Sequence, residues 1–208
     1  MTDRTLVTGA LGRIASLAYA SSAAVYGASD HSPAPESGGT APATLYGVYK
    51  LANEGTARVF FEDEGIASIG IRPYVVYGPG RDQGLTSGPT LAMAAAARSE
   101  GFTIGFGGTV QYDYAPDVGE AFARAARAAT DGAYVANFPG VVATMDEMVA
   151  AIEAAAPEVA GKITASEERL PFPETLEATI LERLVGELPH TSLADGVPQT
   201  IEHFRTPW

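Results

Sequence analysis

The sequence predicts an α/β fold built on a mostly parallel sheet. Three observations lead to this prediction. Short β-branched runs alternate with helical patterns along the chain, capping residues and glycines mark the helix ends, and neither an internal repeat nor a long low-complexity linker interrupts the alternation. Such alternation is typical of parallel strands joined by helices. A length of 208 residues suits one main domain with a small appendage.

Strands and helices are expected in alternation over the first half of the chain. Residues 4–8 (RTLVT) form a β-branched run that ends at Gly9, which is typical of a buried strand followed by a tight turn. A helix is expected over residues 45–64, with Gly65 as its C-terminal stop. Its apolar residues, which recur at close to 3.6-residue spacing, are Leu45, Val48, Ala52, Val59 and Phe60. The other expected elements are a Pro/Gly/Ser-rich loop over 28–42, a buried strand over 66–78, a loop over 78–84 and a helix over 89–99.

The second half continues the pattern. Pro116 opens a helix over 116–129, with Asp117 in the first turn, where a carboxylate suits the helix dipole. Thr144 caps a further helix, and Glu147 occupies the capping-box position. The remaining expected elements are strands over 102–106, 110–114 and 133–138, and one strand with two helices over 158–208.

Composition excludes several classes of function. The 13 basic and 25 acidic residues give a net charge of −12, so nucleic acid is not an expected partner. The absence of cysteine excludes disulfides and thiolate chemistry. Because His31, His190 and His203 are scattered, we expect no metal site. The start (MTDRTLVTGA) is charged where a signal peptide is apolar, and no run approaches the about 20 apolar residues of a membrane span. We therefore expect a cytoplasmic protein.

A glycine turn follows the first expected strand. In TLVTGALGRIAS, Gly9 would make the tight turn and Gly12 would let the backbone approach a pyrophosphate at a helix N-terminus, while Ala15 replaces the usual third glycine. A strand, turn and helix start is the context that a dinucleotide fingerprint requires. An ordinary turn is the alternative.

Tyr46 and Lys50 lie four residues apart in the expected helix, so that both side chains project from one face. A nearby ammonium stabilises a phenolate, and such a tyrosine can take a proton from an alcohol while a hydride leaves the same carbon. Ser22 would orient the substrate oxygen by donating a hydrogen bond. The structural alternatives are a lysine packed over a tyrosine and a serine that satisfies backbone groups at a strand end. No histidine is placed to activate a serine nucleophile, and G-x-S-x-G is absent.

Five segments share one order with a known family: TGALGRIAS, SSAAVYG, YGVYKLANE, IRPYVVYGPG and YDYAPDVGEA. The chain resembles the extended short-chain dehydrogenase/reductase family, in its NAD-dependent epimerase/dehydratase branch, which acts largely on nucleotide sugars. The resemblance covers the first sixteen residues and residues 21–127.

The resemblance implies roles for individual residues. Ser22, Tyr46 and Lys50 match the catalytic serine, tyrosine and lysine, and Lys50 would also hydrogen-bond the nicotinamide ribose. Arg81 is a candidate substrate contact, and Asp117 would only cap a helix. The candidate cofactor-binding residues are Gly9, Gly12, Arg13, Ile14, Tyr46, Lys50, Pro73 and Tyr74. The implied cofactor is NAD, with NADP as the alternative, and the implied partners are a sugar-like small molecule and a second copy of the chain, docked through the helix that carries Tyr46.

One interval departs from the family pattern. Nine residues separate Gly12 from Ser22, where the family has several β–α units, so on the order of 90 residues are absent, including the acid that binds the adenosine ribose. Asp30 lies about 20 residues beyond the glycine turn but is rejected for that role, because it sits in a Pro/Ser loop. About six residues separate TLVTGA from LAYASSA, too few for the dozen that a parallel crossover needs. Three explanations of this short connection remain open: a single helix over 12–26, strand exchange between two chains of a dimer, and a partial or artificial chain.

We therefore expect a reduced Rossmann-like α/β domain over residues 1–138 and a small C-terminal α/β substrate region over 139–208. The expected function is that of an NAD(P)-dependent epimerase, dehydratase or dehydrogenase acting on a sugar, a nucleotide sugar or a related hydroxyl compound. One alternative is a catalytically silent remnant that serves as a binding or oligomerisation module. Another is a cofactor-free enzyme that uses the tyrosine–lysine pair for proton transfer.

Overall fold

The computed structural model describes residues 16–28 and 32–206. Three predictions concern positions outside these residues. They are the strand over 4–8, the glycine turn with Gly9, Gly12, Arg13 and Ile14, and the rejection of Asp30 as the ribose-binding acid.

Single strands and pairs of strands alternate with helices along most of the chain. The strands are β1 (Ser16–Ala20), β2 (Ala67–Arg72), β3 (Val75–Tyr77), β4 (Phe102–Ile104), β5 (Thr109–Tyr114), β6 (Ala133–Asn137), β7 (Val141–Thr144) and β8 (Ile163–Ala165). The helices are α1 (Leu45–Glu64), α2 (Gly88–Ala97), α3 (Ala115–Ala125), α4 (Met145–Ala155), α5 (Ile180–Val185) and α6 (Leu193–Arg205), with short 3₁₀ turns η1 (Ala23–Val25) and η2 (Pro157–Val159).

Parallel pairing dominates the three small sheets. One sheet has the order β1-β2-β6 and is parallel throughout, with Ala18 opposite Ile69 and Ile69 opposite Tyr134. The second has the order β3-β5-β7, in which only β7 is antiparallel, and the third pairs β4 with β8 in parallel. The predicted mostly parallel, Rossmann-like α/β fold is confirmed.

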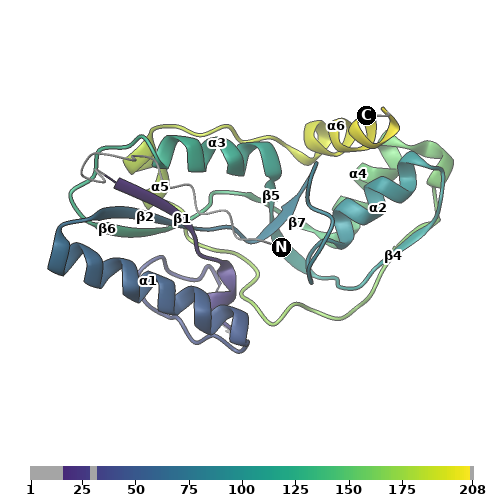
Figure 1. Ribbon diagram of the computed structural model, residues 1–208. Helices are drawn as coiled ribbons and strands as arrows, with labels where there is room; N and C mark the ends of the chain where they lie inside the picture. The colour runs from purple at the N-terminus through teal and green to yellow at the C-terminus, as the bar shows by residue number, and fades with distance from the viewer. Residues whose placement is uncertain (1–15, 29–31, 207–208) are drawn as a thin grey trace.

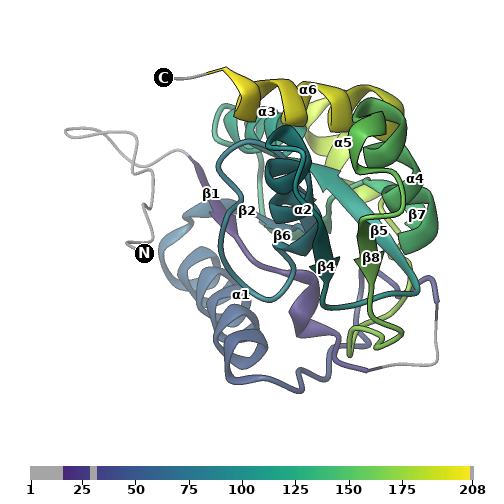
Figure 2. The ribbon, with the colours of Figure 1, turned by 90° about the vertical axis from the view of Figure 1, so that its right-hand side faces the viewer.

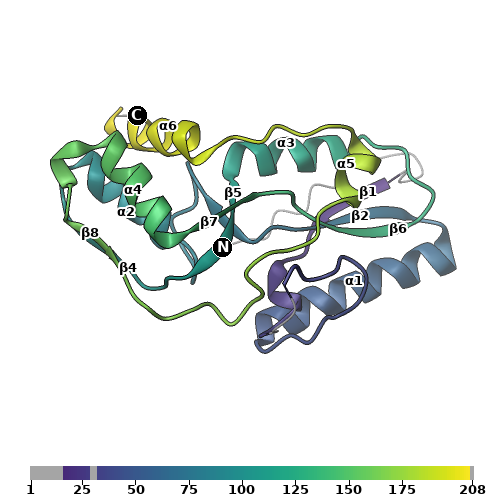
Figure 3. The same cartoon turned by 180° about the vertical axis from the view of Figure 1, so that it is seen from behind.

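Helices cover the sheets in two groups. Helix α1 lies on one face of the β1-β2-β6 sheet, and α3 and α5 lie on the other (Figure 1). Helices α2, α4 and α6 gather around the other two sheets (Figure 2). The chain between β8 and α5 runs back from this second group to the first (Figure 3). Each group encloses its own cluster of buried apolar side chains. No described helix is long and apolar enough to cross a membrane.

The stretch before Ser22 is a strand and not part of a helix. Strand β1 pairs with β2, and the Ser21 N–H continues this pairing by donating to the Ile71 carbonyl at 2.8 Å. The single-helix interpretation of residues 12–26 is therefore wrong from Ser16 onward. Among the described strands β1 has β2 as its one neighbour, so it forms an edge of the sheet as far as the described residues build it.

The expected strand over 66–78 is divided in two. Pro73 has no N–H to donate to a ladder, and the Tyr74 N–H donates to the Asp113 side chain at 2.6 Å instead of to a neighbouring strand. As a result, β2 and β3 belong to different sheets. Strand β7 was not expected, because its four residues carry too short a pattern to stand out.

Helix α1 has the predicted bounds. Thr44 caps its start and Gly65 ends it in the left-handed region, at φ 68°. Its apolar residues are largely exposed, whereas the two fully buried positions are Gly47 and Glu54. The apolar residues that recur at 3.6-residue spacing in α1 thus lie outside the core, because a polar network occupies the buried side of the helix.

Candidate active site

Helix α1 brings Tyr46 and Lys50 together, as its pitch requires. The Lys50 ammonium lies 5.4 Å from the centroid of the Tyr46 ring, a distance at which a cation is attracted to an aromatic face. Tyr46 is 56% exposed, so its phenol is open to a small molecule. The Thr44 hydroxyl accepts a hydrogen bond from the Gly47 N–H at 3.0 Å and so fixes the first turn of the helix.

The segment that carries Ser22 lies directly against this helix. The Lys50 ammonium donates to the Ala20 carbonyl at 2.9 Å, at the end of β1. One turn earlier, a side chain on Gly47 would place its Cβ 2.3 Å from the Ala24 carbonyl oxygen, so only glycine allows this close approach. Strand β1, η1 and α1 thus hold Ser22, Tyr46 and Lys50 on adjoining elements.

Ser22 also performs the local role that is the structural alternative. Its hydroxyl accepts a hydrogen bond from the Ala24 N–H at 3.2 Å and caps η1. A serine hydroxyl accepts and donates at once, so this cap is compatible with donation to a substrate oxygen.

Pro73 and Tyr74 lie beside this segment but serve different neighbours. The Pro73 carbonyl accepts a hydrogen bond from the Ala23 N–H at 2.9 Å. Tyr74 is buried, and its hydroxyl has no hydrogen-bond partner among the described residues. Burial raises the pKa of the Tyr74 phenol, so this hydroxyl stays protonated at neutral pH.

Tyr74 lines a cavity of about 480 Å³. Its ring meets Phe172 edge-on, with the centroids 6.0 Å apart, and Arg169 and Glu174 form an exposed ion pair at 2.7 Å on the same wall. Ser32 and Thr109 are further polar lining residues. An aromatic wall with a few polar groups is typical of small-molecule sites. Sequence reasoning missed Arg169, Phe172 and Glu174, because only the long return of the chain after β8 brings them to β5.

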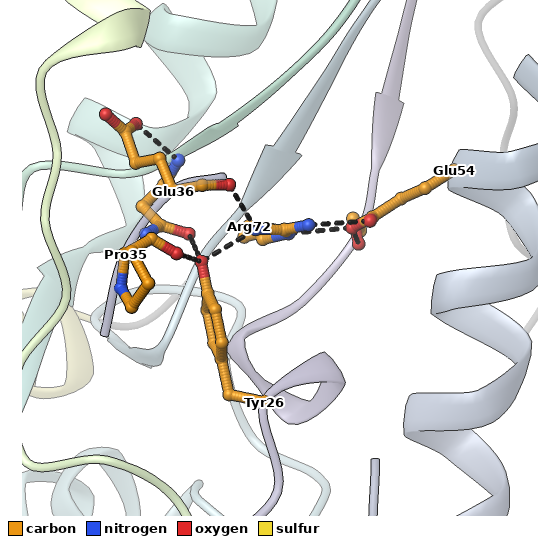
Figure 4. A network of polar contacts seen from close by, with 7 residues as sticks. Tyr26, Pro35, Glu36, Glu54 and Arg72 are labelled. Carbon is orange, nitrogen blue, oxygen red and sulfur yellow. Dashed lines mark hydrogen bonds and ion pairs between the residues drawn. The ribbon is translucent and has the colours of Figure 1, made fainter. Parts of the chain in front are cut away.

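A buried polar network connects the serine segment to the rest of the molecule (Figure 4). Arg72 forms a bidentate pair with Glu54, with Nε and Nη2 at 2.8 and 2.7 Å from the two carboxylate oxygens. The Ser21 hydroxyl donates to the same carboxylate. Arg72 also donates to the Tyr26 hydroxyl at 2.6 Å, which in turn lies 2.9 Å from the Asn137 side-chain oxygen. The sequence contains a signal for this network, since Glu54 lies four residues after Lys50 and eight after Tyr46 on one helix face.

Burial and pairing act in opposite directions within the network. Burial alone would lower the pKa of Arg72, but its hydrogen bonds to Glu54 raise it above the ordinary value, so the guanidinium stays charged. Burial is the main cause of the raised pKa of Tyr26, against the lowering effect of Arg72. The network therefore contains one charged pair and a neutral phenol.

Two further predicted residues have structural contacts. Arg81 folds back on its own loop, where its guanidinium donates to the Thr86 hydroxyl at 3.0 Å and to the Gln83 carbonyl. Its role as a substrate contact remains a prediction. Asp117 lies in the first turn of α3, but its carboxylate also accepts hydrogen bonds from the Thr191 N–H and hydroxyl at 2.8 and 2.9 Å. Asp117 thus ties the C-terminal segment to α3. Within residues 16–28 and 32–206 no group of His, Asp and Glu side chains is arranged to hold a metal ion.

Comparisons with known proteins find epimerases among the similar proteins. UDP-glucose 4-epimerase of Mycolicibacterium smegmatis is 28% identical over 196 residues, which are 89% of this chain and 60% of that protein. A crystal structure of a putative epimerase from Burkholderia cenocepacia has a TM-score of 0.78 at 25% identity, covering 96% of this chain and 66% of that one. The UDP-glucuronic acid 4-epimerase of Bacillus cereus, crystallised with NAD, has a TM-score of 0.72 at 22% identity, covering 91% and 61%.

This chain thus spans about 60% of the length of its curated relative. The profile of the NAD dependent epimerase/dehydratase family matches residues 4–136, which is more than half of the chain. The chain belongs to the NAD dependent epimerase/dehydratase family.

Proposed function

We propose that this chain is an NAD-dependent epimerase or dehydratase that acts on a nucleotide sugar, with Ser22, Tyr46 and Lys50 as its catalytic residues. One observation carries the proposal: the Lys50 ammonium lies between the Tyr46 ring and the carbonyl that ends β1, two residues before Ser22. Family membership and the UDP-sugar epimerases among the similar proteins support it.

The described residues fit the nicotinamide end of a dinucleotide. The Lys50 ammonium has three N–H donors, and one of them is bound by the Ala20 carbonyl. The other two can donate hydrogen bonds to ribose hydroxyls. Pro73 borders the serine segment and Tyr46 is open to solvent, which suits a flat ring at this place. Bound NAD supplies a hydride acceptor. We assign the pyrophosphate to Gly9, Gly12, Arg13 and Ile14 on the sequence pattern alone.

The chain's own residues supply the proton chemistry. Tyr46 accepts the proton of a substrate hydroxyl as that carbon is oxidised, and returns it when the carbonyl is reduced. Lys50 stabilises the phenolate and donates to the ribose, and the Ser22 hydroxyl holds the reacting oxygen in line with Tyr46. The cavity beside Tyr74 receives the distal part of the substrate, where the exposed Arg169 can pair with a phosphate.

A second copy of the chain docks through α1 in this proposal. The helix exposes Leu45, Val48, Tyr49, Val59 and Phe60, each between 44% and 74%, along one side. An exposed apolar stripe on a helix is typical of an interaction surface. The same surface supports the second candidate function, a binding or oligomerisation module without activity.

Titration calorimetry with NAD⁺ and turnover of UDP-glucose separate the two functions. We expect saturable binding near one site per chain, and loss of turnover in Tyr46→Phe with the fold and NAD⁺ affinity retained. Tyr49→Phe is the matched control, since Tyr49 lies on the same helix and is 65% exposed. Retained turnover in Tyr46→Phe would remove the mechanism, and no binding at millimolar NAD⁺ would leave the module as the function.

A further inference from the structure

We propose that Glu54 is a positioning residue, which holds the segment carrying Ser22 in register with Tyr46 and Lys50. This inference rests on the proposed function for its catalytic consequence. It rests on the contacts of Glu54 for its structural part.

Side chains of helix α1 hydrogen-bond to two successive residues at the end of β1, Ala20 and Ser21. Lys50 reaches the Ala20 carbonyl at 2.9 Å, and Glu54, one turn later on the same face, accepts the hydroxyl of Ser21. The lysine contact is exposed to solvent, whereas Ser21 is 2% and Glu54 8% exposed. The contact shielded from water is the stronger constraint, because water does not compete for its hydrogen bond.

Glu54 can position Ser21 because its own carboxylate is fixed by hydrogen bonds. Both of its carboxylate oxygens are bound by Arg72, whose side chain is 4% exposed and which ends β2. Arg72 is held in turn by the Tyr26 hydroxyl and by the Glu36 carbonyl at 3.2 Å. The Ser21 hydroxyl is therefore tied to a rigid set of contacts from α1, β2 and the loop that follows η1.

The position of Ser22 follows from these contacts. Its backbone neighbours are Ser21, fixed by Glu54 and by the Ile71 carbonyl, and Ala23, fixed by the Pro73 carbonyl at 2.9 Å. Among the described contacts, the hydrogen bond from Ser21 to Glu54 is the buried link between this segment and a side chain of the helix that carries Tyr46, beside the exposed link from Lys50 to the Ala20 carbonyl. Misplacement of a reacting group by about 1 Å can reduce a rate on the order of 100-fold.

The test uses Ser21→Ala, which removes the linking hydroxyl but leaves the ion pair of Glu54 and Arg72 in place. Glu62→Gln is the control, because Glu62 is an exposed carboxylate on the same helix, paired with Arg58 at 2.7 Å. Amide hydrogen exchange of the full chain, measured by NMR, reports how firmly the segment with Ser22 is held, and it does not require activity. We expect exchange at Ala23 and Ala24 to rise about tenfold in Ser21→Ala at unchanged melting temperature, and not in Glu62→Gln.

Steady-state kinetics with UDP-glucose and NAD⁺ give the second readout. We expect kcat of Ser21→Ala, expressed per folded protein, to fall about tenfold or more while KM stays unchanged. A smaller folded fraction would also lower the apparent kcat at unchanged KM, so the unchanged melting temperature is needed to exclude it. Unchanged exchange at Ala23 and Ala24, or a kcat equal to that of Glu62→Gln, overturns the proposal. If faster exchange occurs but wild-type protein turns over no nucleotide sugar, the proposed function fails and the positioning of the segment by Glu54 stands.

Discussion

Two buried acids, Glu54 in helix α1 and Asp113 in strand β5, have opposite environments. Glu54 faces β2 and is 8% exposed, with both oxygens bound by the Arg72 guanidinium. Asp113 lies in β5 and has no exposed surface, and no ion pair reaches it among the described residues. From the described residues, its oxygens accept the Tyr74 N–H at 2.6 Å and the Gln111 amide at 3.3 Å.

The difference shows what a cation does for a buried carboxylate. Burial raises the pKa of Asp113 to about 7, although its two hydrogen bonds act in the lowering direction. At Asp113, burial thus outweighs two hydrogen bonds from neutral donors. Glu54 instead forms a bidentate pair with the Arg72 guanidinium and accepts the Ser21 hydroxyl. We infer that Glu54 organises the candidate site. Asp113 fixes the backbone at Tyr74 and titrates near neutral pH.

The largest expected effect comes from breaking the charged pair. Glu54→Gln or Arg72→Met alone should lower the free energy of unfolding by about 3–5 kcal/mol, because the remaining partner stays buried. The double variant Glu54→Leu/Arg72→Met should recover most of this loss. Urea denaturation at pH 7 measures all of them. Single variants that cost less than about 1 kcal/mol would show that the pair is not a buried anchor.

Gly140 packs directly against Asp113 with no room for a side chain, and Gly140→Ala tests this packing. A Cβ on Gly140 would lie 1.9 Å from Asp113 Oδ1 and 2.6 Å from the Tyr112 carbonyl oxygen. We expect a loss of about 1–3 kcal/mol or more from overpacking. Gly119→Ala is the matched control, since nothing lies within 4 Å of its Cβ in α3, and it should gain about 0.5–1 kcal/mol. Equal melting temperatures for the two variants would contradict the packing.

The pH dependence of stability distinguishes the two acids further. The pKa of Asp113 in the folded protein, about 7, lies above that of an unfolded aspartate, so the folded state binds more protons between the two values. Its contribution to stability is therefore full below about pH 4 and is lost as the pH rises through about 7. Relative to Asp113→Asn, the wild-type unfolding free energy should fall by up to about 1.4 kcal/mol per pH unit in this window.

Glu147 supplies a control of opposite sign for the pH measurement. Hydrogen bonds from Thr144 lower the pKa of Glu147, so its contribution is present at neutral pH and is lost as the pH falls. The difference between wild type and Glu147→Gln should therefore shrink toward acid pH. A flat difference between wild type and Asp113→Asn from pH 4 to 8 would exclude titration of Asp113 in the folded protein.

The smallest expected effect on folding lies on the outer side of α1. Phe60 is 51% exposed, so Phe60→Gln should change the unfolding free energy of a single chain by no more than about 0.5 kcal/mol, in contrast to Glu54 on the inner side. Sedimentation velocity should show that the same substitution weakens association between chains. A large loss of stability without any change in association would mean that Phe60 packs within its own chain.

The element pattern, the candidate triad and the family follow from local features of the sequence. Helix α1 begins and ends where Thr44 and Gly65 provide a cap and a left-handed stop, and Thr144 with Glu147 forms the predicted capping box. Residues four apart on a helix share a face in any context, so Tyr46 and Lys50 meet as expected. These outcomes depend on residues close together in the chain. The boundary at 138 and the roles of Ser22, Tyr46 and Lys50 remain predictions.

Tertiary structure alone decided the rest, because it depends on partners distant in sequence. Arg72 lies 18 residues from Glu54 and 46 from Tyr26. The spacing of Glu54 from Lys50 places both on one face of α1, but it does not reveal that Arg72 pairs with Glu54 or that the side with Glu54 is the buried one. Likewise Pro73 divides a run that reads as one strand, and Asp113, 39 residues beyond Tyr74, accepts the N–H freed there. Local propensity sets which elements form, whereas the need to satisfy buried charges and backbone donors sets how those elements face one another.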